Sequence, residues 1–180
     1  LKENLFSLEI RLKDFYIHKI ENKIKNYYYD EFDKNKDYIY YGLQLTTESH
    51  VACHSYPYIN QINVIESISR ALPFGYTLYV KPHPWWDHTV ALSSLKQIKN
   101  IPSVKLIHPN ISIKTILKHS SGIVTLNATT GYEALLLGKP VVALSEVNGY
   151  SQFHPSAFRC IDPYDLPRMI AKMINEKVND

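Results

Sequence analysis

Several things are scarce or absent in this chain, and each absence excludes a class of protein. Only two cysteines occur among 180 residues, Cys53 and Cys160, and they lie too far apart to form a metal motif. We therefore expect a reduced, cytoplasmic protein. No apolar run approaches the roughly 20 residues that span a membrane, and the charged N-terminal stretch does not have the pattern of a signal peptide. The net charge of +3 is small, and the lysines and arginines are scattered along the chain. Nucleic acid is therefore not an expected partner.

The composition is that of an ordinary globular protein, with 45% hydrophobic and 21% charged residues. A chain of this length can bury a core without disulfides or metals. It does not begin with methionine, and we therefore expect it to be a fragment of a longer protein.

Residues 4–28 carry apolar side chains at helical spacing between charges, which predicts an amphipathic helix. Its polar face is basic. Packing on a neighbouring domain or partner is the favoured interpretation, and peripheral attachment to the inner face of the membrane is the alternative. Acidic residues dilute the basic face and weigh against the membrane. Residues 30–37 are almost wholly charged, so we divide the chain into a connecting helix and linker, residues 1–37, and a domain, residues 38–180.

Short apolar strands alternate with helices along the rest of the chain. This alternation predicts an α/β fold with a doubly wound parallel sheet. We expect strands at residues 38–45, 76–81, 104–107, 123–126, 141–144 and 158–161, and helices at residues 58–72, 90–99, 112–119, 132–137 and 165–177.

The loop that follows residues 123–126 is the first candidate site. Asn127, Thr129, Thr130 and Gly131 interrupt the apolar pattern just before a helix. In a parallel sheet, ligands lie beyond the carboxyl ends of the strands, and a helix N-terminus there favours an anion such as phosphate. Capping of the helix by Thr129 or Thr130 is the alternative, and these residues alone do not decide between the two.

The second candidate site is the stretch KPHP at the end of the strand over residues 76–81. Two prolines fix the backbone around His83. A positioned imidazole can bind a phosphate and stabilise charge on a leaving group, and Lys81 would add a positive charge. A turn histidine without a ligand is the alternative, and the second anion-binding loop favours the ligand.

KPHP followed by NATTGYEALLLGKPVV resembles the capsule polysaccharide biosynthesis family, which includes capsular Kdo transferases. The similarity covers about residues 38–150, and GLQLTTES resembles the first motif of the family. Ala128 stands where the family has a serine, so one phosphate-binding hydroxyl is missing, while Thr130 supplies a hydroxyl where the family has an apolar residue.

The resemblance implies the carboxyl-terminal, Rossmann-like half of a GT-B-type glycosyltransferase. That half binds the nucleotide-sugar donor, with a CMP- or UDP-linked sugar and a CMP-Kdo-type donor as the specific expectation. The activity would be glycosyl transfer to a glycan or glycolipid acceptor, and His83 would be the catalytic contact to the phosphate. We expect no metal, because an Asp-x-Asp motif is absent. The residues that the resemblance and the loops assign to donor binding are Gln44, Glu48, Lys81, His83, Asn127, Thr129, Thr130, Gly131 and Glu133.

Two other functions stay open. One is a teichoic-acid-type glycerol or ribitol phosphate transferase, which also uses an HP histidine, and the other is a non-catalytic nucleotide- or glycan-binding module. A nucleotide-sugar epimerase is disfavoured, because its DSGG-type loop is absent. The amino-terminal half of a GT-B enzyme commonly supplies the acceptor site and the general base, so we expect this chain to be inactive alone.

Overall fold

The computed structural model describes residues 24, 26–44, 58–83, 92–126, 128–145 and 153–176. Within them, six strands form one sheet in the order β3-β2-β1-β4-β5-β6, and every neighbouring pair is parallel. The predicted doubly wound sheet is confirmed, and its first strand lies inside the sheet. The strands are β1 (Tyr38–Gly42), β2 (Thr77–Lys81), β3 (Val104–Leu106), β4 (Gly122–Thr125), β5 (Val141–Ala143) and β6 (Ala157–Arg159).

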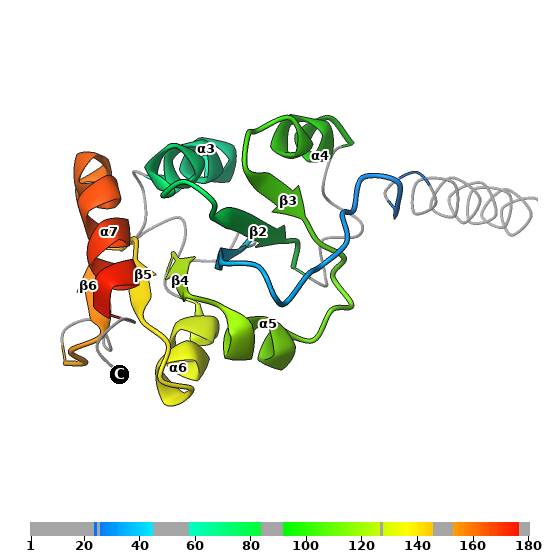
Figure 1. Ribbon diagram of the computed structural model, residues 1–180. Coiled ribbons are helices and arrows are strands. Elements are labelled where there is room, and N and C mark those ends of the chain that lie inside the picture. The colour runs from blue at the N-terminus through cyan, green and yellow to red at the C-terminus, as the bar shows by residue number, and fades with distance from the viewer. Residues whose placement is uncertain are drawn as a thin grey trace, which may run out of the picture.

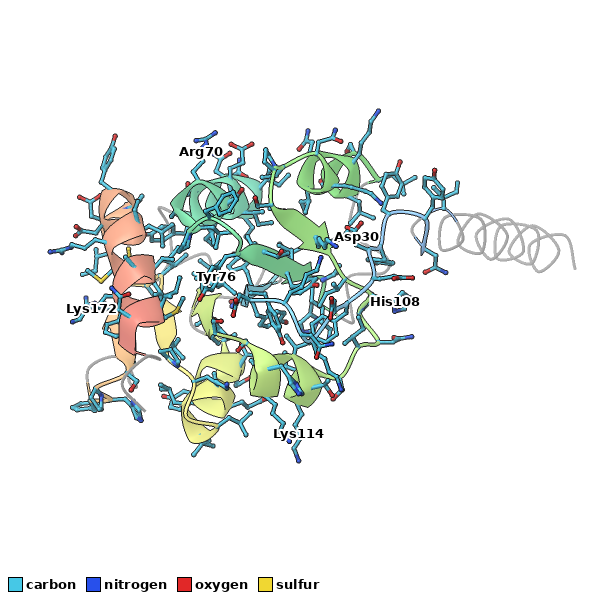
Figure 2. The ribbon with its side chains drawn as sticks, viewed as in Figure 1. Asp30, Arg70, Tyr76, His108, Lys114 and Lys172 are labelled. Carbon is cyan, nitrogen blue, oxygen red and sulfur yellow. The ribbon has the colours of Figure 1, made fainter. Side chains whose placement is uncertain are left out.

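Helices cover both faces of the sheet (Figure 1), with α3, α4 and α7 on one side and α5 and α6 on the other. Arg70 on α3 and Lys114 on α5 point away from the sheet on its opposite sides (Figure 2). No helix in the described part of the chain has the length and apolar character that a bilayer crossing requires. The helices are α3 (Gln61–Ala71), α4 (Leu92–Lys99), α5 (Ile113–His119), α6 (Thr129–Leu136) and α7 (Leu166–Glu176).

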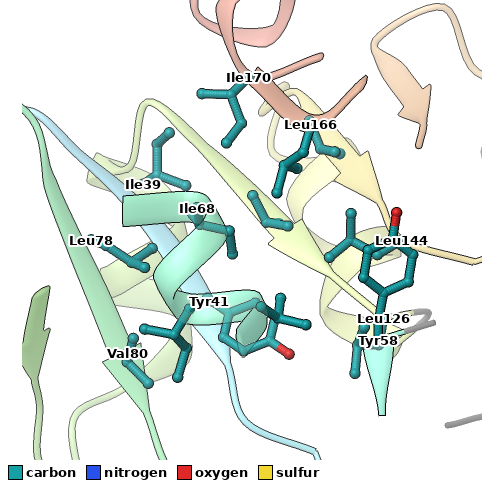
Figure 3. Close-up of a cluster of buried hydrophobic side chains, with 14 of the residues drawn as sticks. Ile39, Tyr41, Tyr58, Ile68, Leu78, Val80, Leu126, Leu144, Leu166 and Ile170 are labelled. Atoms are coloured by element: carbon teal, nitrogen blue, oxygen red, sulfur yellow. The ribbon is translucent and has the colours of Figure 1, made fainter. Parts of the chain in front are cut away.

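The sequences of the strands are nearly continuous apolar runs, because both faces of the sheet are buried. On β1, Ile39 and Tyr41 belong to the core beneath α3 and α7, whereas Tyr38 and Tyr40 belong to the core above α5 and α6. Figure 3 shows the first of these cores, where side chains from the strands meet those of α3 and α7. The alternation fixes which side chains of each strand can reach each face.

Residues just before β1 pack on the sheet. The Asp30 backbone N–H donates to the Leu106 carbonyl at 2.6 Å, and the Asp30 carboxylate accepts from the Leu106 N–H at 3.1 Å. Asp30 lies beside β3 (Figure 2) and also pairs with Lys99 at 3.7 Å. The Phe32 ring packs edge-on against Tyr38 and Tyr79, with ring centroids 5.6 and 5.1 Å away. The boundary at residue 37 stays a prediction, as does the amphipathic helix, which lies almost wholly outside the described residues.

Two deletions test how far the packed unit extends. Removal of residues 1–35 should lower the midpoint of thermal unfolding by several degrees, because it removes both Asp30 and Phe32; a loss of 1 kcal/mol corresponds to about 2–4 °C at this chain length. Removal of residues 1–23 should leave the midpoint nearly unchanged. Equal midpoints for both shortened chains, measured by calorimetry or circular dichroism, would show that the contacts of Asp30 and Phe32 contribute nothing.

Candidate functional site

The carboxyl ends of three neighbouring strands meet at one edge of the sheet. β1 pairs with β2 on one side and with β4 on the other, and the order of the strands reverses between β1 and β4. Such a switch point is where open parallel sheets bind ligands. Gln44 follows β1, His83 follows β2 and α6 begins just after β4, so the two candidate sites and the first motif converge on this edge.

Gln44 is held in place by a glutamine from α3. Gln61 Oε1 accepts a hydrogen bond from the Gln44 backbone N–H at 2.8 Å, and Gln61 Nε2 donates to the Gln44 carbonyl at 2.6 Å. The Tyr41 hydroxyl also donates to Gln61 Oε1, at 3.3 Å. All three residues are buried. Gln61 thus satisfies both backbone groups of Gln44, which would otherwise be buried without partners.

Gln44 then reaches across the switch point to the turn before α6. Its Nε2 donates to Thr125 Oγ1 at 3.3 Å, and the same oxygen accepts from the Ala128 backbone N–H at 3.0 Å. Thr125 therefore joins the end of β4 to the residue that precedes α6.

α6 begins at Thr129, three positions earlier than the sequence predicts, because Thr129, Thr130 and Gly131 form its first turn. Ala128 is the N-cap residue, and its side chain forms no capping hydrogen bond. Thr129 and Thr130 lie inside the helix, so the alternative in which one of them caps it is wrong. Thr129 is exposed, Thr130 is partly exposed and Gly131 is buried. The N-terminal end of α6, with its partial positive charge, lies at the switch-point edge.

Lys81 and His83 differ in their surroundings. Lys81 is only 8% exposed, and its Nζ donates to the Ile111 carbonyl at 2.8 Å, in the loop before α5. Burial lowers the pKa of this amine. Within the described residues no carboxylate pairs with Lys81, and its buried amine is held by a backbone carbonyl. His83 is partly exposed and belongs to neither core cluster.

The remaining predicted site residues are only partly described. Glu133 is exposed on α6, and its charge acts on the buried Tyr40 hydroxyl. Glu48 and Asn127 lie outside the described residues. No group of three metal-binding side chains occurs among the residues that the structure covers, and the prediction that no metal takes part stays untested.

Two other sequence features have structural roles. His154 Nδ1 accepts a hydrogen bond from the Ser156 backbone N–H at 3.2 Å, so this second His-Pro pair organises its own turn. Glu66 and Arg70 form the ordinary helical ion pair that their spacing predicts, at 3.1 Å. A pocket between α3 and α4 includes both of these side chains and Ser103, at the amino end of β3, the opposite edge of the sheet from the candidate site.

Sequence reasoning missed three residues of this edge: Tyr40, Gln61 and Thr125. Gln61 lies in an amphipathic helix where a polar residue is unremarkable, and Thr125 belongs to an apolar strand. Only the spatial approach of β1, α3 and β4 reveals their contacts. No local sequence signal distinguishes them.

Comparison with solved structures shows a shared fold. A Thermosulfurimonas dismutans KpsC, a beta Kdo 2,7 transferase, superimposes with a TM-score of 0.57 at 16% identity, over 87% of this chain and 53% of that one. UDP-GlcNAc 2-epimerase from Methanocaldococcus jannaschii superimposes with a TM-score of 0.60 at 16% identity, over 87% of this chain and 43% of the epimerase. The MnaA–UDP structure from S. aureus superimposes with a TM-score of 0.53 at 17% identity, over 86% of this chain and 42% of that one. This chain therefore spans about half, or less, of these structures.

Sequence comparison identifies the family. No curated protein sequence matches the chain. Residues 2–149, most of the chain, match the family described as capsule polysaccharide biosynthesis protein. The matched region contains β1 to β5 and every residue of the candidate site, as the motifs KPHP and NATTGYEALLLGKPVV predict. This chain belongs to the capsule polysaccharide biosynthesis protein family.

Proposed function

We propose that this chain is the donor-binding half of a glycosyltransferase for capsule polysaccharide, and that its ligand is a nucleotide sugar. The observation that carries the proposal is the convergence of His83, Gln44 and the N-terminus of α6 on one switch-point edge. Family membership and the glycosyltransferase-like fold support it. The acceptor site and the general base would belong to an amino-terminal half, and the acceptor would be a glycan or glycolipid.

The proposed reaction breaks the bond between the anomeric carbon of the donor sugar and a phosphate oxygen. The nucleotide leaves with the electron pair, and the acceptor hydroxyl attacks the anomeric carbon and loses its proton to the base. The leaving phosphate gains negative charge. Donors at a helix N-terminus and a histidine at the end of β2 are suited to stabilise that charge without a metal.

The donor that we propose is CMP-linked and of the Kdo type. The match in fold to a Kdo transferase supports a sugar of this class. UDP is the competing nucleotide, since UDP occurs in related structures. A nucleotide-sugar donor also favours the cytoplasm as the site of action.

Calorimetry on the 180-residue chain tests this proposal. CMP should bind at least about tenfold more tightly than cytidine, because the phosphate contacts distinguish the two, and tenfold corresponds to 1.4 kcal/mol. Titration with UDP under the same conditions decides between the two nucleotides. Equal affinity for CMP and cytidine, or no binding of any nucleotide, would refute donor binding, and sugar transfer by this chain alone would refute the assignment of the base to the other half.

A further inference from the structure

Five tyrosines are buried in the part of the chain that the structure describes, and four of their hydroxyls have partners. Tyr38 donates to the Ile116 carbonyl at 2.6 Å, Tyr41 to Gln61 Oε1 at 3.3 Å, and Tyr58 to the Ile161 carbonyl at 3.1 Å, while Tyr79 accepts from the Asp33 N–H at 3.1 Å. Tyr40 is the exception. It is 4% exposed, and no group among the described residues forms a hydrogen bond with its hydroxyl.

The Tyr40 hydroxyl is directed toward the candidate site. A Cβ atom built on Gly42 would lie 2.9 Å from the Tyr40 hydroxyl oxygen, so the ring extends along β1 toward the carboxyl end of the strand. Gly42 is partly exposed, which brings the hydroxyl just below the surface of the switch-point edge. Gln44, two residues beyond the end of β1, contacts Thr125 there. The Tyr40 hydroxyl can occupy this position because Gly42 has no side chain.

The charge near Tyr40 restricts what the hydroxyl can bind. Burial, and secondly the Glu133 carboxylate, raise the pKa of Tyr40, so the hydroxyl keeps its proton and can donate. A phosphate next to Glu133 would be repelled. A neutral hydroxyl is favourable, because it can accept from Tyr40 without repulsion by the carboxylate.

We propose that Tyr40 is a specificity-determining residue whose hydroxyl binds a neutral ribose hydroxyl group of the nucleotide. This inference rests on the proposed function and adds a contact on the α6 side of β1, separate from the phosphate contacts. A buried hydroxyl without a partner is unfavourable in the free protein, and a ligand hydroxyl supplies the missing hydrogen bond.

The test compares Tyr40→Phe with Tyr38→Phe, which removes the partnered hydroxyl two residues earlier on the same face of β1. Tyr40→Phe should weaken CMP or UDP binding about threefold to tenfold, the size of one hydrogen bond. It should leave the affinity for inorganic pyrophosphate, which has no sugar hydroxyl, unchanged. Its thermal midpoint should be equal to or above that of the unsubstituted chain. Tyr38→Phe should instead lower the midpoint by about 2–4 °C and leave binding unchanged.

Each outcome decides the inference. Unchanged nucleotide affinity in Tyr40→Phe, or a fall in its midpoint like that of Tyr38→Phe, would overturn the role of Tyr40 and leave the proposed function intact. Equal losses of affinity for CMP and pyrophosphate would overturn it too, because the hydroxyl would then act on phosphate. If the unsubstituted chain binds neither nucleotide, both the proposed function and this inference fail.

Discussion

Replacement of His83 by alanine is expected to weaken CMP binding roughly tenfold or more. A hydrogen bond that involves a charged phosphate contributes about 1.5–3 kcal/mol, and 1.4 kcal/mol is tenfold in affinity. The N-terminus of α6 would retain about 0.3–1 kcal/mol of attraction for the anion, so binding should be weakened and not abolished. Stability should change by no more than about 1 kcal/mol, because His83 is partly exposed just beyond the end of β2.

The chain supplies a matched control in its second His-Pro pair. His154→Ala removes an exposed imidazole that organises a local turn, and it should leave CMP affinity unchanged. Calorimetric titration of both variants, with thermal unfolding beside it, makes the comparison. If His83→Ala binds CMP as tightly as the unsubstituted chain, His83 is a turn residue and the phosphate site lies elsewhere.

Gln61→Leu is expected to cause the largest loss of stability, about 2–4 kcal/mol. Leucine has similar volume but leaves the buried N–H and carbonyl of Gln44 without their partner, and each such group costs about 1–3 kcal/mol. The free energy of unfolding in urea measures this directly. Nucleotide affinity should fall as well, since the Gln44 side chain would lose its fixed position beside Thr125.

Ser67→Ala on the same helix is the control for Gln61→Leu. The Ser67 hydroxyl is exposed and bonds only within α3, to the Asn63 carbonyl at 2.8 Å, so its removal should change stability by about 0.5 kcal/mol or less. Comparable losses for both variants would mean that Gln61 acts through helix propensity alone. A stable Gln61→Leu variant that still binds nucleotide would show that Gln44 needs no support from α3.

The fold is predictable because its signals are local. Apolar runs such as residues 141–144 give strands wherever both faces of a sheet are covered, and the alternation with helices then favours parallel pairing. The element boundaries shifted by up to three residues, at the end of β1 and at the starts of α3 and α6. In α6 the cause is that Thr129 and Thr130 looked like a turn before the helix. A loop and a first helical turn have the same small polar residues, so local sequence does not separate them.

The candidate site is predictable only in outline. KPHP and the NATTG loop each end a strand, and a parallel sheet directs strand ends to one edge, so their convergence follows from topology. Lys81 showed the limit: its position suggested a charge in the crevice, but its amine bonds to the Ile111 carbonyl. Tertiary partners such as Gln61 depend on which helix packs where, and one sequence does not encode that in any local pattern.

The pairing of β1 with β4 also governs how the candidate site forms during folding. Gln44 and Thr125, which bond across it, are 81 residues apart in the sequence. Long-range contacts of this kind require entropically costly loop closure, and folds that depend on them form slowly. β2 and β3 follow β1, and β5 and β6 follow β4, so each half of the sheet can assemble from segments that are nearer in the chain. The candidate site forms only when these halves join, and a ligand that spans them would slow their separation.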